Sequence, residues 1–132
     1  MTRPIRILLV DDAAAVRRGL SMRLGREADL EIAGEAEDGQ SAVHFATELR
    51  PDVVLLDVAL PGQDGIATAT QLRARAPECA VIMLTLNDDV VTRARAAAAG
   101  AATLVGKHEP LASLLTAIRA AVPTAATPPQ CC

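Results

Sequence analysis

The sequence predicts a doubly wound α/β domain built around a central five-stranded parallel sheet. Five apolar blocks are each the length of a strand, and several run continuously rather than alternating, which is typical of parallel strands covered on both faces. Helical spacing of apolar residues separates these blocks, so a strand followed by a helix recurs five times. The length of 132 residues suits one domain with one core.

The first two units have the clearest periodicity. The block 5–10 (IRILLV) is the first strand, and the helix after it carries Val16, Leu20 and Leu24 at intervals of four residues. The block 30–34 (LEIAG) is the second strand. On the following helix the apolar residues fit the spacing i, i+3, i+4 and i+7, and they are Ala42, Phe45, Ala46 and Leu49.

The other three strand–helix units have weaker apolar periodicity but follow the same order. Gly100 suits the position just past the fourth helix, and Pro110 suits the first position of the fifth. In chain order the strands and helices are 53–56 (VVLL) with 64–75 and 81–84 (VIML) with 88–99. The fifth strand is 102–105 (ATLV), and the apolar residues of the fifth helix are Leu111, Leu114, Leu115, Ile118 and Val122.

Beyond Val122 the segment PTAATPPQCC loses periodicity and gains proline, so we expect a domain over 1–122 and a linker or flexible tail over 123–132. The adjacent Cys131 and Cys132 lack zinc-site spacing and are read as part of that tail, able to cross-link on oxidation. Cys79 stands beside an expected strand and is read as a small buried or half-buried thiol.

Composition narrows the class of partner. No apolar run reaches the roughly 18 to 20 residues that span a membrane, and the start lacks a secretory cleavage site, so we expect a cytoplasmic protein with no membrane contact. The formal net charge is −3, Trp and Tyr are absent, and Phe45 is the only aromatic residue. A basic or stacking surface is therefore missing, and this chain alone should not bind nucleic acid.

Residues with chemistry follow four of the expected strands. In open α/β sheets the carboxyl ends of the strands form the crevice where ligands bind. At those ends stand Asp11, Asp12, Asp57, Thr85 and Lys107. A carboxylate after a strand can also cap a helix or a turn, and for Asp12 alone that reading is as good, but it does not account for all five positions.

Three clustered carboxylates require a cation. At separations of ~4 Å they repel by ~1 kcal/mol per pair in water and ~4 kcal/mol at an effective dielectric near 20. A small oxygen-only site with room for water favours Mg²⁺ over a calcium cage. With Lys107 and the Thr85 hydroxyl alongside, the site suits a phosphoryl group, and one carboxylate is left to act as a nucleophile and form an acyl phosphate.

These residues resemble the receiver domain of bacterial response regulators, a flavodoxin-like (βα)5 fold. The resemblance covers about residues 4 to 122, and GEAEDGQSAV (34–43) with RPDVVLLD (50–57) is most similar to the NarL/FixJ-type subfamily. Type, order and strand-end placement all agree. The motifs that carry it are LLVDD (8–12), PDVVLLDVALPGQDG (51–65), VIMLT (81–85), AGA (99–101) and Lys107.

The resemblance implies a role for each matching residue. Asp57 would be the phosphoacceptor, Asp12 a direct Mg²⁺ ligand, and Asp11 a ligand acting largely through water. Thr85 and Lys107 would hold the phosphoryl oxygens. The main-chain carbonyl of Ala59 would complete the metal shell, and Pro61 and Gly65 would shape the loop after the acceptor strand.

The resemblance also implies a mechanism and partners. A sensor histidine kinase would present a phosphohistidine, Asp57 would attack it, and water would later hydrolyse the acyl phosphate. The domain would assist its own modification without turning over an external substrate, so it is not expected to be an enzyme. Phosphorylation would shift a pre-existing equilibrium between two conformations of the domain. The surface around the fourth and fifth helices would carry the output, and the phosphorylated domain could form a homodimer. DNA would be contacted only through a helix-turn-helix domain absent from this chain.

Three positions depart from the family pattern. Leu104 stands where the family has Tyr or Phe, so an aromatic switch is missing. Leu86 follows Thr85 where a small residue is usual, and it would either crowd Asp57 or pack where the aromatic ring would swing. His108 replaces a proline that is often joined by a cis bond, so we expect a trans bond and a solvent-facing side chain.

Two other functions remain open from the sequence. A Mg²⁺-dependent phosphohydrolase with an Asp nucleophile has an acid/base Asp two residues later, where this chain has Ala59. A phosphorylation-independent interaction module is the stronger alternative, because Leu104 and Leu86 alter the switch. The arginines at 17, 18, 23 and 26 are read as a solvated helix face, with a docking patch as the alternative.

Overall fold

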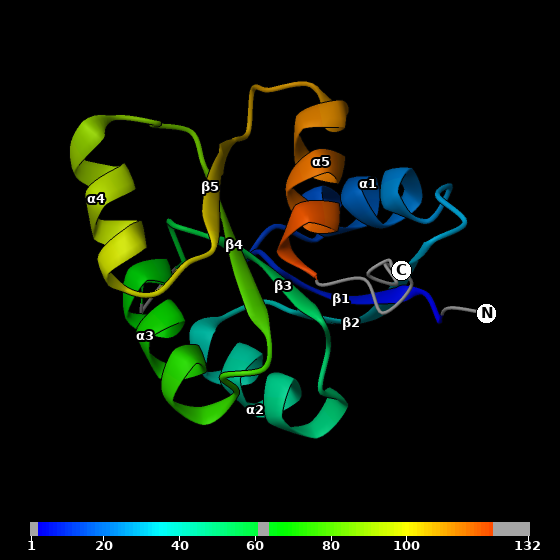
Figure 1. Ribbon diagram of the computed structural model, residues 1–132, viewed down its shortest axis with the longest axis horizontal. Helices are drawn as coiled ribbons and strands as arrows, with labels where there is room; N and C mark the ends of the chain where they lie inside the picture. The colour runs from blue at the N-terminus through cyan, green and yellow to red at the C-terminus, as the bar shows by residue number, and fades with distance from the viewer. Residues whose placement is uncertain (1–2, 61–63, 123–132) are drawn as a thin grey trace, which may run out of the picture.

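The computed structural model describes residues 3–60 and 64–122. It confirms one sheet of five parallel strands with a helix after each strand (Figure 1). The order of the strands in the sheet is β2-β1-β3-β4-β5. The elements are β1 (Ile5–Val10), α1 (Ala14–Leu24), β2 (Leu30–Ala36), α2 (Gly39–Leu49), β3 (Val53–Asp57), α3 (Gly65–Arg75), β4 (Ala80–Thr85), α4 (Val90–Ala98), β5 (Thr103–Gly106) and α5 (Leu111–Ala121).

Helices cover both faces of the sheet. In Figure 1, α1 and α5 lie on one face and α2, α3 and α4 on the other. Each face has its own apolar cluster, because successive residues of a strand point to opposite sides. Leu8 and Val10 belong to the cluster under α2, α3 and α4, whereas Ile7 and Leu9 belong to the cluster under α1 and α5. The continuous apolar runs of the sequence are thus explained by burial on two sides.

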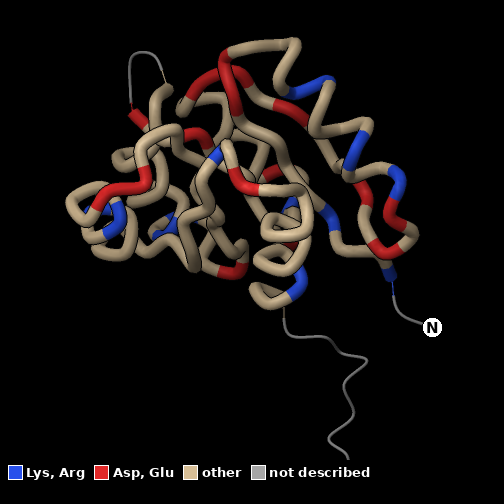
Figure 2. The backbone as a smooth tube through the Cα atoms, turned by 90° about the horizontal axis from the view of Figure 1, so that it is seen from above, with Lys and Arg blue, Asp and Glu red and all other residues tan. Residues whose placement is uncertain are grey.

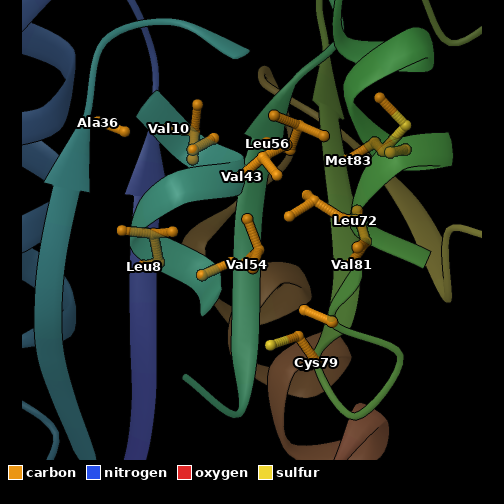
Figure 3. Close-up of a cluster of buried hydrophobic side chains, with 14 of the residues drawn as sticks. Leu8, Val10, Ala36, Val43, Val54, Leu56, Leu72, Cys79, Val81 and Met83 are labelled. Atoms are coloured by element: carbon orange, nitrogen blue, oxygen red, sulfur yellow. The ribbon is translucent and has the colours of Figure 1, made fainter. Parts of the chain in front are cut away.

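Figure 3 shows the cluster beneath α2 and α3. Val54 and Leu56 of β3 lie between the side chains of β1 and β4, and Leu72 of α3 packs over them. Cys79 closes the lower end and is 1% exposed, so the expectation of a buried thiol is confirmed. Burial raises the pKa of this thiol to about 11, with a smaller contribution from the negative charges of Glu78 and Asp52.

Three helices begin at an aspartate that caps them. In each case the aspartate side chain accepts a hydrogen bond from the backbone amide three residues later. The pairs are Asp38 with Ser41, Asp64 with Ala67, and Asp89 with Thr92. Each caps a backbone donor that the helix itself leaves unpaired.

Gly100 marks the end of α4, and Pro110 marks the start of α5. Gly100 follows α4 with φ of 96°, as expected for a residue past a helix C-terminus. Pro110 is one position earlier than expected: it is the N-cap of α5, with φ of −65° and an extended ψ of 155°. The proline ring fixes φ at a value that suits both the N-cap and the first helical position. The sequence pattern alone therefore could not decide between these two positions.

Charged side chains tie the outer parts of the fold together, and acidic and basic positions both occur over many elements in Figure 2. Arg119 of α5 donates to Asp29 at 2.8 Å and to Glu27 at 2.9 Å, just before β2. The hydrogen bond from Arg119 lowers the pKa of Asp29. Across the described ranges, no helix is both long and apolar enough to cross a membrane.

Candidate functional site

The structure brings the three predicted aspartates together. β1 and β3 are neighbours in the sheet, and Val10 is paired with Leu56, so both strands end at the same level. One carboxylate oxygen from each of Asp11, Asp12 and Asp57 lies within 4.8 Å of the others. Asp11 and Asp57 are buried, at 3% and 5% exposure, whereas Asp12 is exposed.

Lys107, the only lysine of the chain, reaches into this cluster from the end of β5. Its Nζ donates to Oδ2 of Asp57 at 3.1 Å and to Oδ2 of Asp11 at 3.3 Å. Partial burial opposes the charged amine, but the hydrogen bonds and negative charges of Asp57 and Asp11 outweigh it, so the pKa of Lys107 is raised. The lysine therefore stays protonated among the carboxylates at neutral pH.

The carboxylate of Asp57 is held from two sides. Its Oδ1 accepts the amide of Ala59 at 3.0 Å, while Oδ2 faces Lys107. Gly65, the first residue of α3, lies so close that a Cβ there would come within 2.2 Å of the Asp57 carbonyl oxygen. The start of α3 is thus pressed against the end of β3, which supports the expected role of Gly65. Pro61 lies outside the described residues.

Asp11 has a partner at each of its polar groups. Its amide donates to the Ala36 carbonyl at 3.1 Å, and its carbonyl accepts Nη1 of Arg17 at 2.6 Å. Its side chain accepts the amide of Ala13 through Oδ1 and Lys107 through Oδ2. The Asp11 side chain therefore binds the backbone amide of Ala13, the residue just before α1. Asp12 does not serve as the helix cap.

Thr85 ends β4, beside β3, and is 5% exposed. Its hydroxyl accepts the amide of Asn87 at 3.0 Å and donates to the Asn87 carbonyl at 3.1 Å, so it is bound within its own loop rather than to the aspartates. The Thr85 carbonyl accepts the amide of Lys107 at 2.6 Å. Backbone contact thus links the loops that carry Thr85 and Lys107.

The three departures from the family pattern occupy different environments. Leu104 is buried at 6% exposure in β5, whereas Leu86 is 74% exposed and does not pack into the interior. His108 is exposed, and among the described residues every peptide bond is trans, as expected.

Sequence reasoning missed several residues that shape the site. Arg17 was expected to be a solvated residue, but its side chain is 15% exposed and bonded to Asp11 and Glu35. Glu109 accepts the buried amide of Gly106 at 2.7 Å and so holds the loop of Lys107. Asn87 binds Thr85 through main-chain atoms, which no side-chain motif reveals.

The donor set fits a small hard cation. All three atoms that could bind a cation are carboxylate oxygens, which Mg²⁺ and Ca²⁺ prefer over nitrogen or sulfur. Two of the carboxylates are buried, and the exposed Asp12 leaves a side open to water, which suits the partly hydrated Mg²⁺.

Comparison with known proteins agrees with this arrangement. Residues 7–119 match the response regulator receiver domain family. This chain belongs to that family. LiaR of Bacillus subtilis, a transcriptional regulatory protein, is 40% identical over 119 residues, covering 89% of this chain and 56% of LiaR. The response regulator protein VraR of Staphylococcus aureus is 39% identical over 92 residues, covering 68% of this chain and 44% of VraR.

Solved receiver structures share the fold. A two-component response regulator of the LuxR family from Aurantimonas has a TM-score of 0.85 at 32% identity, covering 89% of this receiver and 84% of that chain. The response regulator domain of Thermotoga maritima CheB has a TM-score of 0.84 at 31% identity, covering 90% and 96%. This receiver spans about half the length of the curated relatives it matches.

Proposed function

We propose that Asp57 accepts a phosphoryl group from a sensor histidine kinase in a reaction that depends on Mg²⁺. The observation that carries this proposal is the pairing of the buried Asp57 carboxylate with Lys107, next to the carboxylates of Asp11 and Asp12. The proposal covers the phosphoacceptor role of Asp57, the metal-binding roles of Asp11, Asp12 and the Ala59 carbonyl, and the phosphoryl-binding roles of Thr85 and Lys107.

The transfer makes one bond and breaks one. An oxygen of Asp57 forms the new P–O bond, the P–N bond of the phosphohistidine breaks, and the imidazole nitrogen leaves with the electron pair. Lys107 already stands beside the Asp57 carboxylate and would follow the charge onto the phosphoryl oxygens. The Ala59 amide fixes the orientation of the carboxylate before the attack. Mg²⁺, when held by the three aspartates, would neutralise the charge shared between the carboxylates and the phosphoryl group.

Thr85 must change partner to take its role. Its hydroxyl is bound to Asn87, so engagement of a phosphoryl oxygen on Asp57 would break two hydrogen bonds of that turn. Breaking them would release the segment that leads into α4. Phosphorylation adds about −1.5 to −2 units of charge, which is the driving force for drawing Thr85 and Lys107 inward.

The output surface would lie at the start of α4. Three large apolar side chains are exposed there, Leu86 at 74%, Val90 at 83% and Val91 at 68%. They follow Thr85 directly along the chain, so a change at Thr85 would move them. Exposed apolar patches of this kind are typical of contact surfaces. We propose that this surface serves output or a homodimer.

The output is proposed to be regulation of transcription, as in LiaR. Contact with DNA would then belong to a helix-turn-helix domain outside the receiver. Water would finally attack the phosphorus of the acyl phosphate, releasing inorganic phosphate and restoring Asp57. The receiver would assist both steps on itself and would turn over no external substrate.

The test is the intact mass of the protein after incubation with acetyl phosphate, with Mg²⁺ and with EDTA. We expect a gain of one phosphoryl group with Mg²⁺ only, and its loss in Asp57→Asn. Asp38→Asn is the matched control, because it removes a carboxylate at the α2 N-cap, where Asn caps equally well. The control should gain the phosphoryl group as the wild type does.

The alternative is a receiver used as an interaction surface without phosphorylation. A wild-type protein that binds Mg²⁺ but gains no phosphoryl group, from either acetyl phosphate or a phosphorylated kinase, would favour that alternative. A phosphoryl group that persists in Asp57→Asn would place the acceptor on another residue.

A further inference from the structure

Arg17 has no part in the proposed phosphoryl transfer. It lies on α1, one turn after the acidic pair, and only 15% of its side chain is exposed. Its Nε donates to Oε1 of Glu35 on β2 at 2.9 Å, and its Nη1 donates to the main-chain carbonyl of Asp11 at 2.6 Å. One guanidinium therefore links α1, β2 and the end of β1.

The bond to the Asp11 carbonyl acts on the following residue as well. The carbonyl of Asp11 and the amide of Asp12 belong to one planar peptide unit, so holding the oxygen fixes the orientation of the whole unit. The amide of Ala13 is bound to Oδ1 of Asp11, which fixes the next turn of the backbone. Asp12 thus lies between two restrained points.

Asp12 has little else to position it. It is exposed, and within residues 3–60 and 64–122 its side chain takes part in no hydrogen bond or ion pair. Asp11 and Asp57, in contrast, are buried and bound to Lys107. The backbone of Asp12 must therefore supply the order that its side chain lacks, and Arg17 is the charged group that holds it.

We propose that Arg17 is a positioning residue that makes the acidic cluster selective for Mg²⁺ over Ca²⁺. This inference rests on the proposed function, since it concerns the same metal site. Mg²⁺ requires near-ideal octahedral geometry, whereas Ca²⁺ accepts longer and variable contacts. Displacement of Asp12 therefore affects Mg²⁺ more than Ca²⁺. A change in charge alone affects both ions alike, because both are divalent.

Arginine suits this task better than lysine. Its planar fork reaches the Glu35 carboxylate and the Asp11 carbonyl at once, while a lysine amine offers a point charge on a flexible stem. The neighbouring Arg18 offers a matched control, because it lies on the same helix, is exposed, and has no hydrogen bond or ion pair among the described residues.

The experiment is calorimetric titration of MgCl2 and CaCl2 at constant ionic strength into wild type, Arg17→Ala, Arg17→Lys and Arg18→Ala. Circular dichroism first confirms that each variant is folded at the titration temperature. We expect the Kd for Mg²⁺ to rise about tenfold in Arg17→Ala, as for other groups that orient metal ligands, and the Kd for Ca²⁺ to rise by less than half as much. Arg17→Lys, which keeps the charge, should also lose preference for Mg²⁺, and Arg18→Ala should keep it.

Three results would overturn the inference. They are an unchanged or tighter Mg²⁺ Kd in Arg17→Ala, an equal change for both ions, and a wild-type ratio of the two Kd values in Arg17→Lys. A wild-type protein that binds no Mg²⁺ would instead remove the proposed metal site, and the inference with it. The wild-type titration therefore separates failure of the proposed function from failure of the role of Arg17.

Discussion

The Thr85 hydroxyl is both a donor and an acceptor to a single residue: it donates to the Asn87 carbonyl and accepts a hydrogen bond from the Asn87 amide. These two hydrogen bonds close the turn after β4. The proposed mechanism instead requires the Thr85 hydroxyl at a phosphoryl oxygen on Asp57. Engagement of Thr85 in the proposed phosphorylated state would therefore compete with the hydrogen bonds of this turn rather than with hydrogen bonds to water.

Removal of the Thr85 hydroxyl should weaken the fold. In Thr85→Val we expect the free energy of unfolding to fall by about 1–3 kcal/mol, because two hydrogen bonds are lost and each contributes about 0.5–1.5 kcal/mol. Thr85→Ser keeps the hydroxyl and is the control for hydrogen bonding. Urea unfolding followed by circular dichroism measures the difference, and a valine variant as stable as the serine variant would contradict it.

The pKa of Lys107 should depend on Asp57. The wild-type pKa is raised above 10.5 by Asp57 and Asp11 despite partial burial, so we expect Asp57→Asn to lower it. Because Lys107 is the only lysine, selective 13C labelling gives one side-chain signal whose titration NMR can follow. Asp88→Asn, at an exposed position bonded to Arg93, is the control. An unchanged pKa in Asp57→Asn would show that the pairing is not formed in solution.

The same shift gives a pH dependence of stability. A lysine whose folded pKa exceeds its unfolded pKa contributes stability that is fully present below about 10.5 and is lost as the pH rises through the folded value. Wild type should therefore lose stability in that alkaline range relative to Lys107→Met. Denaturation midpoints of the two proteins measured between pH 8 and 11 should converge as the pH rises; parallel curves would argue against this assignment.

Two glycines should respond in opposite directions to alanine. Gly65→Ala places a Cβ against the Asp57 carbonyl oxygen, and we expect a loss of about 1–3 kcal/mol in the free energy of unfolding. Gly19→Ala, in the middle of α1 with no atom within 4 Å of the new Cβ, should gain about 0.5–1 kcal/mol from helix propensity. Thermal unfolding compares them, and a Gly65→Ala protein as stable as wild type would mean that α3 can move away from Asp57.

Cys79 should be unreactive in the native state. Its burial and its pKa of about 11 leave little thiolate at neutral pH. In a Cys131→Ser, Cys132→Ser protein, a thiol-reactive disulfide reagent should modify Cys79 only as fast as the protein unfolds. Rapid modification without denaturant, compared with complete modification in urea, would show that the lower end of the sheet opens.

The sequence predicted the parts of the site that depend on topology alone. Asp11 and Asp57 follow apolar blocks that form neighbouring strands, so their convergence follows once the parallel order is assumed. The doubly buried sheet was visible for the same reason, as continuous apolar runs. Helix starts were less certain. The fourth helix begins at Val90 rather than 88 because Asp89 is its cap, a distinction that apolar spacing does not contain.

Contacts that cross between elements could not be read from the sequence. Arg17 lies 18 residues before Glu35, and its place among several arginines of one expected helix predicted a solvated side chain. Only the approach of β2 to α1 turns Arg17 into a partly buried link between the two elements. Likewise the choice of partner for the Thr85 hydroxyl depends on the path of the backbone at Asn87, which has no signature in residue type.

The separation along the chain of the groups that meet at the site has a consequence for how the protein forms. The contact of Lys107 with Asp11 spans 96 residues, and its contact with Asp57 spans 50. Among the described strands, β5 lies at the edge of the sheet and pairs only with β4. During synthesis the four earlier strands can emerge before the lysine does. Until the fifth strand docks, the clustered aspartates repel one another, because the positive charge of Lys107 is not yet beside them. Only a chain folded through its fifth strand brings Lys107 to the aspartates, so a ligand that needs all of these groups would bind fully folded molecules selectively.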